Sequence, residues 1–147
     1  MIEKVIERWH RVISGEGEDL DDLLAEDVVF YSPVVFTPQE GREVTKLYLG
    51  AAANTFGGSE PASSGGGGGT FRYTKQVLHG NHAVLEFETE MGGKYVNGVD
   101  IITCNDEGRI VEFKVMIRPL QAIQAVHAAM GRMLKAMQEG AASSADA

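Results

Sequence analysis

One acidic side chain stands out because of its surroundings. Asp100 lies in the middle of YVNGVDIITC, an apolar and β-branched stretch at residues 95–104. Side chains alternate between the two faces of a strand, so Asp100 shares a face with Val96 and Ile102. An ionised carboxylate is costly to bury without a partner, and burial raises its pKa. Asp100 is therefore the first candidate for a catalytic acid or for the polar anchor of a ligand.

Two interpretations of Asp100 are open from the sequence. It can be a pocket acid whose pKa is raised by apolar walls. It can also be a structural carboxylate that accepts a hydrogen bond from Trp9 Nε1, a tyrosine or a backbone amide. Trp9 is more typical of a core residue than of a ligand platform. Tyr31 and Tyr48 could each present a phenol to a cavity or lie at the edge of the core.

The other residues with chemical potential do not form a recognisable motif. Ser32 has no nucleophile-elbow sequence around it, which argues against a hydrolytic triad. The Gly/Ser run at residues 57–69 lacks phosphate-loop spacing and is expected to be a flexible loop. Metal sites need three or four convergent ligands, so we expect no metal and no cofactor. The four histidines are not spaced as metal ligands are; they are His10, His79, His82 and His127.

Composition excludes several classes of partner. The 147 residues carry a formal net charge of −8 with scattered Lys and Arg, which disfavours nucleic acid and anionic membranes. The single cysteine, Cys104, excludes an intramolecular disulfide. The N-terminus has no signal-peptide core and no apolar run reaches transmembrane length, so a cytoplasmic protein is expected.

Apolar periodicity predicts one domain over residues 1–139, followed by a disordered tail at 140–147. Strands that follow one another in a run indicate an antiparallel sheet with helices on one face, an α+β fold. A strongly curved sheet of this kind leaves a cone-shaped cavity. On the last strand, Val111, Phe113, Val115 and Ile117 are expected to share an apolar face. The predicted elements are helices at 2–14, 19–24, 43–56 and 121–138, strands at 27–31, 71–78 and 81–91, a loop at 34–41, and two long strands within 95–120 joined by a turn at 105–108.

These elements resemble a known family. Trp9 on the first helix, LLAEDVVFYSPV at residues 23–34, the GREVTKLYL helix and the terminal hairpin are similar to the nuclear transport factor 2-like superfamily, especially its SnoaL-like branch. That branch includes polyketide cyclases and relatives of ketosteroid isomerases. The resemblance implies a cone-shaped α+β barrel with an apolar pocket, which often dimerises through its sheet. The residues expected to line the pocket are Trp9, Phe30, Ser32, Tyr48, Phe87, Asp100, Phe113 and Val115.

The resemblance transfers the chemistry only in part. Ketosteroid isomerases use a carboxylate just before a proline as the base, and Ser32 occupies that position here. Their oxyanion hole pairs a tyrosine of the first helix with a protonated aspartate, which match Trp9 and Asp100. The Asp-Arg-Asp set of limonene epoxide hydrolases finds no match in Glu112, Lys114 and Arg118 of the last strand.

Two functions follow as hypotheses. The first is a protein that binds a small apolar molecule, with Asp100 as polar anchor. The second is an isomerase or cyclase in which Asp100 is the catalytic acid and the base is unidentified. Ser32 at the base position favours the first. A homodimer through the outer sheet face is also expected, with Glu86, Glu88 and Glu90 facing solvent or the partner, and Met130, Met133 and Met137 packing, lining the pocket mouth or facing the partner.

Overall fold

The structure is a computed structural model. It describes the backbone of residues 1–56 and 71–146 and the side chains of residues 1–52 and 71–136. The Gly/Ser run expected to be flexible, at residues 57–69, lies outside the described residues.

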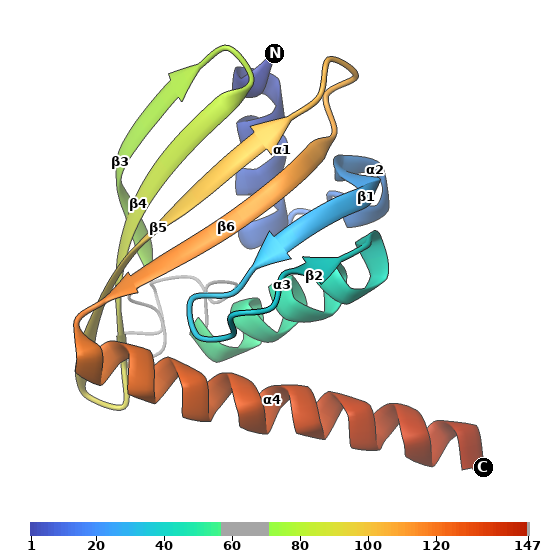
Figure 1. The fold of residues 1–147 in the computed structure, drawn as a ribbon, viewed down its shortest axis with the longest axis vertical. Helices are drawn as coiled ribbons and strands as arrows, with labels where there is room; N and C mark the ends of the chain where they lie inside the picture. The colour runs from blue at the N-terminus through green and yellow to red at the C-terminus, as the bar shows by residue number, and fades with distance from the viewer. Residues whose placement is uncertain (57–70, 147) are drawn as a thin grey trace.

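Each predicted helix and strand in this part of the chain is present (Figure 1). The long last helix runs to Asp146, so it continues through most of the segment that the sequence assigns to a tail. No helix in the described residues is long and apolar enough to cross a membrane. The elements are α1 (Ile2–Ile13), α2 (Leu20–Leu23), β1 (Leu24–Tyr31), β2 (Gln39–Glu40), α3 (Arg42–Phe56), β3 (Arg72–His79), β4 (His82–Met91), β5 (Lys94–Cys104), β6 (Ile110–Arg118) and α4 (Leu120–Asp146).

Six strands form one curved sheet in the order β2-β1-β6-β5-β4-β3. Strands β3 to β6 follow one another through short turns and are antiparallel. The expectation of a wholly antiparallel sheet is wrong at one place, because β1 pairs with β6 in parallel, with Phe30 opposite Phe113. Hairpin turns force neighbouring strands to run antiparallel. A whole helix and four strands separate β1 from β6, so no short turn dictates their relative direction.

Two differences in β1 and β2 have local causes. Strand β1 begins at Leu24, three residues before the predicted start at Asp27. The prediction missed these residues because the exposed Glu26 and Asp27 interrupt the alternation that marks a strand. Strand β2 lies inside the segment predicted as a loop. It is only two residues long and follows Pro38, so it carries no periodic signal.

The hairpin of β5 and β6 contains the expected turn and one irregularity. Asn105 Oδ1 accepts hydrogen bonds from the backbone N–H groups of Glu107 and Arg109, at 3.0 Å each. A shift in register pairs Cys104 with Ile110 and Thr103 with Glu112. The prediction that Val111 shares the buried face of β6 is therefore wrong, since the bulge places Ile110 there, fully buried.

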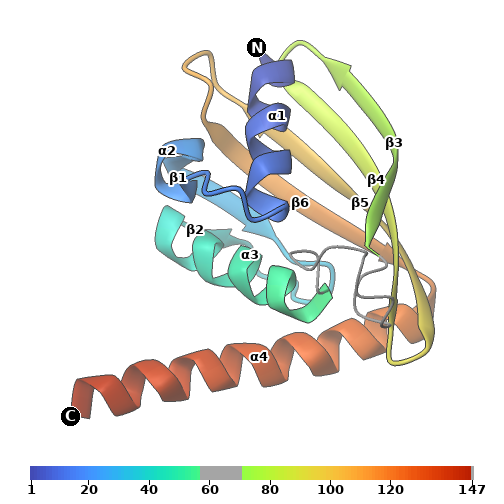
Figure 2. The same ribbon diagram turned by 180° about the vertical axis from the view of Figure 1, so that it is seen from behind.

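The helices cover the concave side of the sheet, and α4 crosses the end of the sheet beside α3 (Figures 1 and 2). One face of α1 is an apolar stripe, in which Ile2, Val5, Ile6 and Trp9 are buried. They pack in one core cluster with inward side chains of the sheet such as Leu85 and Phe113. A second cluster joins Phe87 and Val96 to Ala122 and Val126 of α4. The helices therefore wall a space over the sheet rather than fill it.

Gly98 of β5 gives Phe87 the room to lie in that space. A Cβ built on Gly98 would lie 2.7 Å from the Met116 carbonyl oxygen and closer still to Cζ of Phe87. We expect Gly98→Ala to displace the Phe87 ring and to destabilise the fold by about 1–3 kcal/mol, as overpacked cores do. Urea unfolding of the variant and the wild type measures this difference.

Gly131→Ala is the matched control, because a Cβ on Gly131 of α4 would meet no atom within 4 Å. This change is expected to leave stability unaltered or raise it by up to about 1 kcal/mol, the helix preference of Ala over Gly. Equal unfolding midpoints for Gly98→Ala and the wild type would contradict the close packing at Phe87.

Candidate functional site

A cavity of about 410 Å³ opens between the concave face of the sheet and the helices. Its walls come from α1, α2, α3, α4 and all the strands except β2, and most of its lining side chains are apolar. Such a volume is within the range of pockets that hold small molecules.

A chain of hydrogen bonds connects three elements at the cavity wall. Trp9 Nε1 of α1 donates to the Tyr73 hydroxyl of β3 at 2.9 Å. The Tyr73 hydroxyl donates in turn to Asp100 Oδ2 of β5 at 2.5 Å. Asp100 is only 6% exposed. Its other oxygen, Oδ1, has no hydrogen-bond partner among the described residues, so one side of the carboxyl group is fixed and the other is available to the cavity.

The buried setting changes the acidity of both groups. Burial raises the pKa of Asp100 to about 7, and the hydrogen bond from Tyr73 opposes the rise. Burial and the neighbouring Asp100 raise the pKa of Tyr73 well above its usual value, so its hydroxyl stays protonated as a donor. Tyr73 uses its single proton on Oδ2. A proton carried by Asp100 is therefore available from Oδ1 to an acceptor in the cavity.

All eight residues predicted to line a pocket surround this one cavity. Trp9 belongs to the core as well, with its ring centroid 5.0 Å from that of Phe113 in an edge-on contact. The Tyr48 ring lies in a tilted contact with Phe30, with 5.2 Å between the ring centroids. Tyr31 is not among the lining residues, and its ring lies 4.8 Å from Lys114 Nζ.

Ser32 lines the cavity but is engaged by its own loop. Its Oγ accepts hydrogen bonds from the backbone N–H groups of Val34 and Val35, at 3.1 and 3.3 Å. A neutral hydroxyl with its lone pairs engaged in this way is not equipped to remove a proton from carbon.

Sequence reasoning missed Tyr73, the partner that decides the geometry of Asp100. The sequence RYTKQVLH shows no regular alternation of apolar and polar residues. In the structure, a bulge between Tyr73 and Lys75 shifts the register, and most of β3 is exposed. What identifies Tyr73 is its position opposite Phe87 in the neighbouring strand. This pairing is seen in the structure and not in the local sequence.

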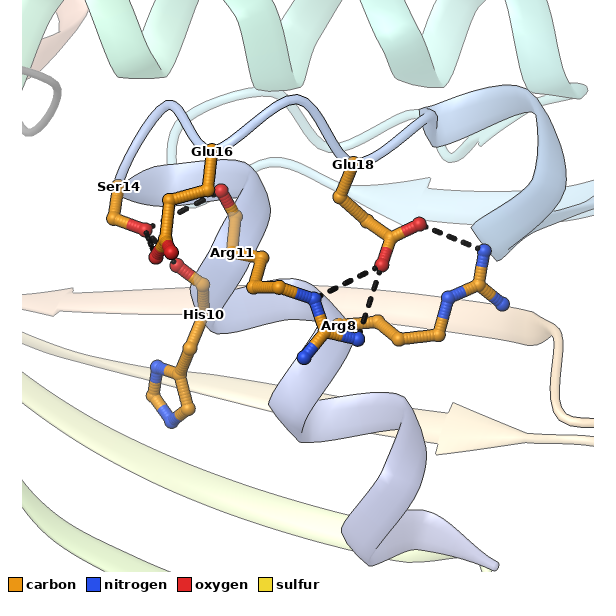
Figure 3. A network of polar contacts seen from close by, with 6 residues as sticks. All are labelled: Arg8, His10, Arg11, Ser14, Glu16 and Glu18. Atoms are coloured by element: carbon orange, nitrogen blue, oxygen red, sulfur yellow. Dashed lines mark hydrogen bonds and ion pairs between the residues drawn. The ribbon is translucent and has the colours of Figure 1, made fainter.

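A polar network at the end of α1 fixes the approach to the cavity (Figure 3). Glu18 bridges Arg8 and Arg11, with N–O distances of 3.1 and 3.2 Å, and Arg8 lowers the pKa of Glu18. Ser14 Oγ donates its proton to Glu16 Oε2 at 2.6 Å and lies 2.9 and 3.3 Å from the carbonyl oxygens of His10 and Arg11. These bonds hold the turn between α1 and α2, which carries Leu20 to the cavity wall.

His10 connects this turn to Tyr73. Its ring points away from Ser14 and Glu16 (Figure 3), and its Nε2 lies 2.8 Å from Gln76 Oε1 of β3. The same ring meets Tyr73 edge-on at 5.5 Å. Within the described residues, no group of three or more His, Cys, Asp or Glu side chains could hold a metal ion.

Comparison with known proteins connects this geometry to a family. A structure described as a steroid delta-isomerase from Pseudomonas aeruginosa is 32% identical, over 94% of each chain, with a TM-score of 0.79. The chain belongs to the same family as this structure, and its fold is that of nuclear transport factor 2-like and SnoaL-like proteins. An uncharacterised protein with a cystatin-like fold from Silicibacter pomeroyi is also 32% identical, over 87% of this chain and 83% of that one, with a TM-score of 0.72.

A more distant neighbour shares the fold alone. An NTF2-like protein of unknown function from Mesorhizobium loti is 22% identical, over 80% of this chain and 93% of that one, with a TM-score of 0.60. Neither a protein-family model nor a curated protein matches the chain.

The acidity of Asp100 predicts how the stability of this protein depends on pH. Its folded-state pKa of about 7 lies above the unfolded value of 3.8, so the folded protein binds more protons between these values. The stabilisation linked to this proton is complete below pH 3.8 and is lost as pH rises through 7. The shift corresponds to about 4 kcal/mol.

We expect the unfolding free energy of the wild type to fall, relative to that of Asp100→Asn, by up to this amount between pH 4 and pH 8, because asparagine does not titrate. Urea unfolding at pH values across this range measures it. The exposed Asp27→Asn serves as control and should run parallel to the wild type. Parallel curves for the wild type and Asp100→Asn would show that Asp100 titrates normally.

Proposed function

We propose that this protein binds a small, mainly apolar molecule in the cavity, with a carbonyl or phenol group hydrogen-bonded to Asp100. The observation that carries the proposal is the carboxyl group of Asp100, whose Oδ1 has no described partner although the residue is only 6% exposed on an apolar wall. In these apolar surroundings, a hydrogen bond from Oδ1 to a ligand is stronger than the same bond in water.

The protonation state of Asp100 selects the kind of ligand group. As a neutral acid it donates a hydrogen bond and suits a ketone oxygen. As a carboxylate it only accepts, and suits a phenol hydroxyl. With a pKa of about 7, Asp100 reaches both states near neutral pH.

Two naphthalene probes test this choice. We expect the phenol 2-naphthol to bind the wild type at pH 8 at least about tenfold more tightly than it binds Asp100→Asn, since a hydrogen bond to a charged acceptor contributes about 1.5–3 kcal/mol. The ketone 2-acetonaphthone should bind the wild type more weakly at pH 8 than at pH 5.5, whereas its affinity for Asp100→Asn stays constant. Isothermal titration calorimetry measures both.

The exposed Asp27→Asn is again the matched control and should keep the wild-type affinities. Binding of both probes that is equally strong with and without Asp100 would remove the anchor role. A complete lack of binding to the wild type would count against the ligand class.

A second function is favoured by one comparison. The 32% identical structure from Pseudomonas aeruginosa is described as a steroid delta-isomerase. In an isomerisation of this kind, a base removes the proton between a ketone and a double bond and returns it at the far end of that bond. A neutral Asp100 would stabilise the developing enolate oxygen. Ser32 offers no base, which is why binding without turnover ranks first; conversion of a β,γ-unsaturated steroid ketone to its conjugated isomer would reverse that order.

We also propose a homodimer formed through the outer face of the sheet. The outer apolar patch consists of Val77, Val84, Val99, Ile101 and Met116, and three of these (Val77, Val84 and Met116) are 54%, 37% and 51% exposed. Charged side chains such as the ion pair of Arg72 and Glu88, at 2.9 Å, flank the patch. An apolar centre with a polar rim is typical of subunit interfaces.

Light scattering coupled to size-exclusion chromatography tests the dimer. At micromolar concentration we expect twice the 15.9 kDa of one chain. Val84→Arg places a charge in the outer apolar patch and should give the monomer mass, whereas Glu7→Arg on the exposed side of α1 should leave the dimer intact. A monomeric wild type would overturn this interface.

A further inference from the structure

His127 of α4 is a second polar group on a cavity whose walls are otherwise mainly apolar. It lines the cavity and is exposed to solvent, so it lies where the cavity meets the outside. The preceding residue, Val126, is buried in the core, and consecutive helix residues point in different directions, so His127 lies at the edge of the buried side of α4. Met130 and Gly131, one helical turn further, line the cavity too.

The other polar groups of the described lining are engaged or lie with Asp100. Trp9 Nε1 and the Tyr73 hydroxyl are used within the hydrogen-bond chain that ends on Asp100. Ser32 Oγ accepts two backbone N–H groups. Among the titratable side chains of this lining, Asp100, Tyr48 and His127 therefore retain hydrogen-bonding capacity toward a ligand.

We propose that the ligand has an apolar body with two polar ends, one hydrogen-bonded to Asp100 and the other, at the cavity rim, to His127. This inference rests on the proposed function, because Asp100 holds the inner end. The apolar lining between the two sites accounts for the body, since each buried CH₂ contributes about 0.8 kcal/mol. An imidazole can donate and, when charged, attract an anion, so a carboxylate or another acceptor suits the outer end.

Tyr48 is the competing partner for the outer end. Its ring packs at a tilt against Phe30 as part of the wall, and the residue is half-buried, whereas His127 is exposed. A polar or charged group of a ligand keeps more of its hydration at an exposed rim than inside the wall, so His127 is the better partner.

Matched pairs of probes test the proposal. Each pair consists of a phenol and the same phenol with a carboxylate at the far end: 2-naphthol with 6-hydroxy-2-naphthoic acid, and biphenyl-4-ol with 4′-hydroxybiphenyl-4-carboxylic acid. Two body lengths are used so that one can reach the rim. Calorimetry at pH 6.5 gives, for each pair, the ratio of the two dissociation constants, which isolates the effect of the carboxylate.

We expect the carboxylate to improve the affinity of the wild type for at least one pair by about fivefold, the scale of a partly exposed charged contact. His127→Leu should abolish this gain, which is taken relative to the parent phenol measured on the same variant, and His127→Gln should retain part of it. Tyr48→Phe and Gln124→Leu, the latter exposed on α4 outside the cavity lining, should keep the gain.

The outcomes separate the two levels of the proposal. If neither parent phenol binds the wild type, the proposed function fails and this inference fails with it. If the parents bind but no carboxylate gives a gain that depends on His127, the two-ended ligand is excluded while the binding function stands. A gain that Tyr48→Phe abolishes and His127→Leu preserves would overturn the role of His127.

Discussion

The carboxyl group of Asp100 needs a donor in a place from which water is largely excluded, and the surrounding elements are arranged to provide one. Asp100 is in the middle of β5, so the donor has to come from another element. Tyr73 lies opposite Phe87, and Phe87 lies opposite Gly98, two residues from Asp100 on the same face. Trp9 then fixes the tyrosine hydroxyl from α1. These two hydrogen bonds therefore form only when α1, β3 and β5 are correctly placed relative to one another.

The two interpretations of Asp100 that are open from the sequence are compatible in the structure. One carboxyl oxygen accepts from a tyrosine, as a structural carboxylate would. The other has no described partner, as a pocket acid requires. Because Tyr73 supports only one oxygen, it lowers the pKa less than burial raises it. A second donor would stabilise the charged form further and would remove the capacity to hold a proton near neutral pH.

Sequence reasoning succeeded where local rules apply and failed where long-range register decides. The stripe of α1, the turn at Asn105 and the buried face of β5 follow from periodicity and turn chemistry. The parallel partner of β1, the bulge that replaces Val111 by Ile110, and the position of Tyr73 depend on how distant strands align. The eight residues expected around a pocket do surround the cavity, because inward strand faces and helix stripes are local patterns. From the sequence, His127 lacks metal-ligand spacing and has no predicted role. Only the packing of α4 brings it to the cavity.

The parallel pairing of β1 with β6 also constrains the order in which the chain can fold. When residues 1–56 have been synthesised, β1 has only the two-residue β2 to pair with. Its parallel partner β6 does not yet exist, and neither do β3, β4 and β5, which α1 contacts. Strands β3 to β6 pair with sequence neighbours and close short loops, which form quickly, whereas contacts between distant segments form slowly. We therefore expect strands β3 to β6 to form first, and α1 and β1 to pack on them afterwards.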